Sequence, residues 1–156
     1  MEKQPSSKMC FVCGRENPNG LHMHFATDSD GCVYSDYVPR PEDQSYPGVM
    51  HGGLLTAMLD EIIGRTAIAS DLWCMTAKLQ VRFRKPVPLG EPLKLKGQIT
   101  KHTGRLLEGR GEIRLADGSL AVEAHGTYLR IPNEQMEQYK SALEWWRVED
   151  ETTTDG

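Results

Sequence analysis

The longest apolar stretch of the chain predicts a buried helix. It runs from Gly52 to about Ser70, and its apolar residues fall on nearly every face instead of forming one stripe. That distribution is typical of a helix enclosed by the rest of the core. The apolar positions are Leu54, Leu55, Ala57, Met58, Leu59, Ile62, Ile63, Ala67 and Ile68.

Alternation of apolar and polar residues predicts strands on both sides of this helix. Two strands are expected before it, at Leu21–Phe25 and Cys32–Val38. Four are expected after it, at Met75–Arg84, Leu93–His102, Leu106–Leu115 and Leu120–Ile131. The spacing of apolar residues then changes to a helical one, which predicts an amphipathic helix over Asn133–Arg147.

These elements predict a single α+β domain over residues 1–156, a length that suits one domain with its own core. A curled antiparallel sheet would wrap around the central helix, and the amphipathic helix would follow at the C-terminus. Residues 1–9 and 149–156 have no such periodicity and are expected to be flexible ends.

Composition narrows the classes of function. The net charge is −4 and the isoelectric point about 5.7, so the overall charge balance does not supply the basic surface that general nucleic-acid binding requires, although a local basic patch is compatible with it. It contains no stretch of about 20 apolar residues that would span a membrane. The first residues lack the apolar segment of a secretory signal. We therefore expect a cytoplasmic protein with reduced cysteines.

Two adjacent carboxylates lie in the middle of the buried helix, where charges are unfavourable unless they are paired or used. Glu61 precedes Arg65 by four residues, so an ion pair along the helix accounts for it. Asp60 has no cation at helical spacing. Its two interpretations are a buried carboxylate held by hydrogen bonds from a strand, and a general base or nucleophile.

The helix begins with His51-Gly52-Gly53. Two glycines at a helix start allow a ligand to approach the backbone, and the unpaired N–H groups there favour negative charge. The oxyanion formed from a thioester carbonyl would suit such a position. The alternative is a glycine turn that only directs the chain into the core, with His51 in a structural role.

Two long motifs in this region resemble a known family. The segment from Pro47 to Asp60, PGVMHGGLLTAMLD, and the segment from Met75 to Leu89, MTAKLQVRFRKPVPL, are similar to the PaaI-like hotdog thioesterases. The similarity is greatest to the branch that contains human thioesterase superfamily member 4. The resemblance implies a hotdog fold, hydrolysis of acyl-coenzyme A without a cofactor, and a homodimer or a dimer of dimers.

The resemblance also implies roles for individual residues. Asp60 corresponds to the catalytic carboxylate, and Thr76 to the hydroxyl that helps to place the attacking water. The Gly52 N–H corresponds to the donor that polarises the thioester carbonyl, and His51 supports its loop. Several members carry an asparagine about six residues before the motif histidine; here Ser45 stands at that position, beside Gln44.

Candidate substrate-binding residues lie at two turns. Gly53 belongs to the helix start that a ligand can approach. The resemblance places Arg105 near the phosphates of coenzyme A. Lys101 and Arg105 also flank the tight turn at Gly104, where cationic side chains can meet a phosphate or simply be solvated.

The distance between Gly52 and Asp60 has a consequence for the quaternary structure. The two are eight residues apart, or about 12 Å along a helix, whereas catalytic groups must come within roughly 3–3.5 Å of one reacting centre. If both act on one thioester, they come from different subunits. The rival functions are a hotdog dehydratase, whose acid–base pair is not evident, and a non-catalytic acyl-CoA-binding or sensing protein.

Cys10 and Cys13 form a CxxC motif, with His22 and His24 further along the chain. Two cysteines and two histidines are a possible tetrahedral zinc set. The usual second ligand pair with its own spacing is missing, and residues 17–20 are not the helix that follows a redox CxxC. The preferred interpretation is a packed loop, with no metal.

Overall fold

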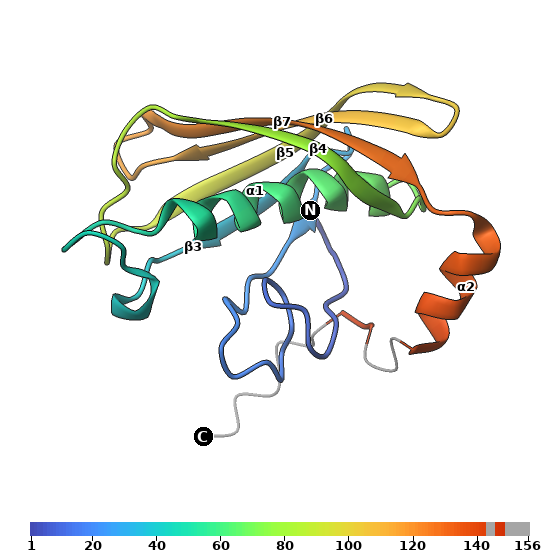
Figure 1. Cartoon of the computed structure of the whole chain (residues 1–156), viewed down its shortest axis with the longest axis horizontal. Helices are drawn as coiled ribbons and strands as arrows, with labels where there is room; N and C mark the ends of the chain where they lie inside the picture. Colours follow the sequence, from blue (N-terminus) through green and yellow to red (C-terminus); the bar gives the residue numbers. More distant parts are fainter. Residues whose placement is uncertain (143–145, 149–156) are drawn as a thin grey trace.

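The protein folds as an antiparallel sheet curled around one long helix (Figure 1). This computed structural model describes residues 1–142 and 146–148. The described sheet has seven strands in the order β1-β2-β3-β5-β6-β7-β4. These are β1 Glu2–Lys3, β2 Ala26–Thr27, β3 Val33–Tyr37, β4 Cys74–Phe83, β5 Leu93–Thr103, β6 Leu106–Arg114 and β7 Leu120–Arg130. The helices are α1 Gly52–Ile68, the 3₁₀ helix η1 Pro41–Asp43 and α2 Asn133–Ala142. The predicted α+β hotdog architecture is confirmed.

Helix α1 lies between two layers, which explains its all-round apolar character. The curled sheet covers one side of α1, and the loop formed by the N-terminal residues lies on the other (Figure 1). Helix α1 comes so close to the sheet that the facing strand positions must be glycine. A Cβ at Gly97 of β5 would lie 2.6 Å from the carbonyl oxygen of Ile62, and one at Gly109 of β6 would collide with Ile63. The helix therefore packs directly on the backbone of the central strands.

The strand predictions are confirmed to within one residue at each end for β3 to β7, and the start of α1 is confirmed at Gly52. The predicted strand at Leu21–Phe25 is wrong. Its side chains do alternate between buried and exposed. However, the N–H groups of Leu21 and Met23 donate to the carbonyls of Phe11 and Val12, in the loop that holds the CxxC motif, and not to a strand. The backbone of His22 has a positive φ of 52°, so the segment cannot continue as a strand.

The two chain ends also differ from expectation. Residues 2–7 are not a loose lead-in: Glu2–Lys3 forms β1, and Gln4 is buried, with its side chain donating to Thr27 and to the carbonyl of Arg65. Helix α2 does not reach Arg147, which pairs with Ser6 in an isolated bridge. The predicted flexible segment 149–156 lies outside the described residues. No helix in the described part is long and apolar enough to cross a membrane.

A buried carboxylate holds the loop that leads into α1. Asp43 is 1% exposed and accepts hydrogen bonds from the Tyr37 hydroxyl and from the backbone and guanidinium of Arg40. Burial acts to raise the pKa of Asp43, but the hydrogen bonds from Arg40 and Tyr37 outweigh it and hold the pKa below its usual value. The carbonyl of Asp43 accepts the His51 N–H, so this cluster positions the residue that caps the helix.

Replacing Asp43 by asparagine is expected to lower the free energy of unfolding by about 2 kcal/mol at pH 7, because buried donors lose their charged acceptor. A carboxyl with a lowered folded-state pKa stabilises the fold at neutral pH, and this stabilisation disappears as the pH falls from about 4 through the folded-state pKa. The difference from wild type should shrink over that range in urea titrations. Asp36→Asn, in an exposed pair with Lys94, is the control and should change little.

Candidate active site

The start of α1 presents one unpaired backbone donor. His51 is the N-cap, and its Nδ1 accepts the Gly53 N–H at 2.8 Å. That hydrogen bond occupies the Gly53 donor and supports a positioning role for His51. Among the described residues, the Gly52 N–H has no hydrogen-bond partner. Because the first N–H groups of a helix favour negative charge, Gly52 offers a site for a developing oxyanion.

Gln44 and Ser45 lie in the loop before α1, where several members of the family carry an asparagine. The Gln44 side-chain oxygen accepts the Gly48 N–H at 3.0 Å and is therefore engaged within its own loop. Ser45 is exposed, and its N–H donates to the Val49 carbonyl. Neither side chain is brought to Asp60, which lies further along the helix.

Asp60 is half-buried in the middle of α1, and two hydroxyls fix its carboxylate. Thr76 of β4 donates to Oδ1 at 2.7 Å, and Tyr128 of β7 donates to the same oxygen at 2.9 Å. The β4–β7 pairing shifts register between Thr76 and Lys78. In the described residues Oδ2 receives no hydrogen bond, so one carboxylate oxygen is held in place while the other is left to interact with a bound molecule.

Sequence reasoning found Thr76 but missed Tyr128. The two residues are direct partners in the β4–β7 register, which a single sequence does not reveal. Burial raises the pKa of the Tyr128 phenol, and the neighbouring Asp60 carboxylate raises it further. Tyr128 is therefore a neutral donor to Asp60 at physiological pH. The sequence could have pointed to Tyr128, because it is a tyrosine on the inward side of a predicted strand and a buried phenol needs a hydrogen-bond partner.

A small cavity of about 160 Å³ opens beside the carboxylate. Its lining residues are Asp60, Glu61, Gly64, Arg65, Ile68, Trp73, Cys74, Thr76 and Tyr128. The predicted Glu61–Arg65 ion pair is confirmed, with 2.9 Å between Oε1 and Nε. A larger cavity of about 760 Å³ lies along β1 to β3 and contains none of the candidate catalytic residues.

The basic candidates lie at the tip of the β5–β6 hairpin. Gly104 has a φ of +55°, as the tight turn requires, and Lys101 and Arg105 are exposed on either side of it. Thr76 lies opposite Tyr128 on the neighbouring strand, and Tyr128 lies opposite Leu107 on the next one. Leu107 in turn pairs with the end of β5 that lies beside this turn. The hairpin tip and the Asp60 site therefore lie toward the same end of the sheet.

Several known proteins are similar to this chain. Residues 47–122 match the Thioesterase superfamily. Acyl-coenzyme A thioesterase THEM4 from Bos taurus is 28% identical over 136 residues, which is 86% of this chain and 56% of that protein. A crystal structure of a thioesterase superfamily protein is 33% identical, with a TM-score of 0.75, over 78% of this chain and 63% of the other. The matched residues, which make up about half of the chain, include α1 and strands β4 to β6 of the hotdog fold.

A third similar protein is a hypothetical thioesterase from Streptococcus pneumoniae. Its structure with coenzyme A is 22% identical, with a TM-score of 0.66, over 70% of this chain and 85% of that one. The protein has also been solved as an aspartate-to-alanine and as a threonine-to-alanine mutant. The present chain spans about half the length of the curated relatives that it matches.

Proposed function

We propose that the protein hydrolyses acyl-coenzyme A thioesters, with Asp60 as general base or nucleophile. The observation that carries the proposal is the Asp60 carboxylate, which Thr76 and Tyr128 hold through one oxygen while the other is left unbonded beside a cavity. A carboxylate held in this way is poised for reaction.

Either of two routes gives a free acid and coenzyme A. As a general base, Asp60 takes a proton from water, the resulting hydroxide attacks the thioester carbon, and the proton passes to the departing thiolate. As a nucleophile, Asp60 attacks the carbon and expels the thiolate, and water then opens the mixed anhydride. In both routes the thioester oxygen becomes negative, and the Gly52 N–H is the donor placed to stabilise it.

The Streptococcus pneumoniae mutants support the choice of residues. The aspartate and threonine replaced in that protein are 16 positions apart, and Asp60 and Thr76 are separated by the same number of positions. Its complex with coenzyme A supports a coenzyme A thioester as the substrate class. The curated relative THEM4 supports an acyl-CoA as the compound that is hydrolysed.

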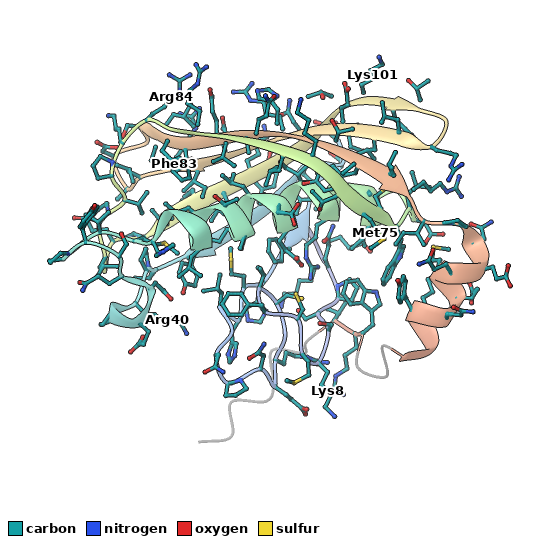
Figure 2. All side chains as sticks on the ribbon, in the orientation of Figure 1. Lys8, Arg40, Met75, Phe83, Arg84 and Lys101 are labelled. Atoms are coloured by element: carbon teal, nitrogen blue, oxygen red, sulfur yellow. The ribbon has the colours of Figure 1, made fainter. Side chains whose placement is uncertain are left out.

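We infer that each site is shared between two subunits, because one helix cannot bring Gly52 and Asp60 to the same thioester. Strand β4 supplies a surface for the second subunit. It forms one end of the described sheet and pairs there only with β7. Met75 and Phe83, which Figure 2 labels, lie near the two ends of this strand. Their side chains are 55% and 53% exposed. Exposed apolar side chains on an open strand edge favour association with another chain.

The main alternative is a protein that binds acyl-CoA without hydrolysing it. A panel of acyl-CoAs of different chain length and aromaticity, assayed for free thiol with a chromogenic disulfide, distinguishes the two. The proposed function predicts catalytic release of thiol well beyond one equivalent per chain for at least one compound. Tight binding of an acyl-CoA without any thiol release would favour the binding protein.

Replacing Arg105 by alanine is expected to raise KM for acyl-CoA several-fold with little change in kcat, because a phosphate contact would be lost while the chemistry is not. The penalty should shrink as salt rises, since screening weakens exposed charge contacts. Acyl-pantetheine lacks the nucleotide phosphates and should be hydrolysed equally well by both proteins. Equal damage with the two substrates would exclude a phosphate role. Lys94→Ala, at an exposed lysine at the opposite end of β5 from this turn, is the control.

A further inference from the structure

The CxxC loop packs against the other carboxylate of α1. The Sγ atom of Cys10 lies 3.9 Å from Oε2 of Glu61. The two sulfur atoms of Cys10 and Cys13 and a carboxylate oxygen of Glu61 all lie within 4.8 Å of one another. Three donor atoms that suit a metal ion thus converge from a loop and a helix that are about 50 residues apart in the sequence.

Glu61 is oriented toward the two cysteines by its ion pair. Arg65 binds Oε1 through Nε, which leaves Oε2 facing Cys10. Arg65 itself is 1% exposed and is fixed by hydrogen bonds from Nη1 to the Gln4 side chain and the Pro5 carbonyl. The carboxylate therefore has one oxygen held by a rigid cation and one directed into the cluster, an arrangement typical of supported metal ligands.

One backbone N–H and one hydroxyl of the loop contact the sulfur atoms. The Cys13 N–H donates to Cys10 Sγ at 3.5 Å, and the Ser7 hydroxyl lies 3.8 Å from Cys13 Sγ. The Gly14 N–H donates to the Cys10 carbonyl at 2.7 Å, which closes a tight turn. A Cβ at Gly14 would collide with the Cys10 backbone, so the turn requires glycine there. The Cys13 N–H favours the thiolate form of Cys10, which is the form that binds metals.

We propose that Cys10, Cys13 and Glu61 bind one Zn²⁺ ion, with water as the fourth ligand. Tetrahedral zinc with bond lengths near 2.3 Å to sulfur and 2.1 Å to oxygen places its ligand atoms about 3.6–3.8 Å apart. The 3.9 Å between Cys10 and Glu61 needs only a small side-chain movement. Two thiolates and one carboxylate around Zn²⁺ carry one net negative charge, which the Arg65 guanidinium balances.

This ligand set differs from the one that the sequence suggested. His22 is exposed, and its Nε2 contacts the Asn17 carbonyl instead of the cysteines. Among the described residues, the metal-ligating cluster contains Glu61 and neither His22 nor His24. The proposed site is an alternative to the metal-free loop that the sequence favours, and metal analysis distinguishes the two. Its metal would tie the N-terminal loop to the helix that carries Asp60.

The test uses the whole 156-residue chain, purified under reducing conditions, stripped by a chelator and titrated with Zn²⁺ or Co²⁺. We expect one Zn²⁺ per chain, a higher melting temperature on loading, and a thiolate-to-cobalt charge-transfer band with Co²⁺. Cys10→Ser and Cys13→Ser should weaken or remove the band. Glu61→Gln should lower Zn²⁺ affinity at least about tenfold. It retains the shape of the side chain, so it tests the ligand even if a cysteine variant fails to fold.

Cys32→Ser and Cys74→Ser are the matched controls, because both thiols are half-buried and lie outside the cluster. Each should keep the wild-type band and stoichiometry. Reduced, folded wild-type protein that gives no charge-transfer band overturns the proposal. So does a band that disappears equally in Cys32→Ser, or Zn²⁺ binding that Glu61→Gln leaves unchanged. These readouts do not depend on thioesterase activity.

Discussion

Replacing Asp60 by asparagine is expected to lower kcat for acyl-CoA hydrolysis by about two orders of magnitude or more. Asparagine neither takes a proton from water nor attacks a thioester, so both proposed routes lose their reacting group. The fold should persist, because the amide oxygen still accepts the hydrogen bonds that Thr76 and Tyr128 donate to Oδ1. KM should change much less than kcat, since the variant removes an interaction with the transition state.

Steady-state thiol release by the wild type and the variant measures this effect, and circular dichroism and melting temperature verify the fold. Asp36→Asn is the matched control, because it removes an exposed carboxylate far along the sheet in β3. It should retain full activity. An Asp60→Asn enzyme within fivefold of wild-type kcat would show that this carboxylate does not carry the reaction.

The pattern of apolar and polar residues predicted the regular helices and strands, because burial repeats along such elements with a fixed period. Helix α1 was predictable because it is enclosed between the sheet and the N-terminal loop, so apolar residues appear on all its faces. Alternation in segment Leu21–Phe25 correctly predicted which side chains are buried. It could not predict that the backbone partners are Phe11 and Val12 of a loop, because alternation reports the sides of a segment and not its pairing.

Polar residues with distant partners were the least predictable. Gln4 is buried because its side chain reaches Thr27 and the Arg65 carbonyl, 61 residues away. The i,i+4 spacing correctly predicted the ion pair of Glu61 with Arg65. It gave no sign that the second carboxylate oxygen of Glu61 faces Cys10. Tyr128 reaches Asp60 through a strand register that only the folded sheet defines. Spacing within one helix is readable in a sequence, whereas contacts across strands and loops are not.

The second large effect is expected in mixed dimers. Gly52→Pro removes the backbone N–H at the first residue of α1, where proline is tolerated. The nearest atom to a new Cβ at this position is 3.3 Å away, on the Phe83 ring. Gly52→Ala adds a Cβ but keeps the N–H, so it separates steric effects from loss of the donor. Gly52→Pro and Asp60→Asn homodimers should each be nearly inactive, while Gly52→Ala retains much of its activity.

The most direct test of the shared site is the activity recovered when the two inactive variants are unfolded and refolded together. Random pairing makes half of the dimers mixed, and each mixed dimer holds one site with an intact Gly52 from one chain and an intact Asp60 from the other. The account predicts thiol release approaching roughly a quarter of the wild-type value. If both groups came from one chain, every site would be defective. A mixture that contains heterodimers, confirmed by differently tagged chains, and yet stays inactive would contradict the account.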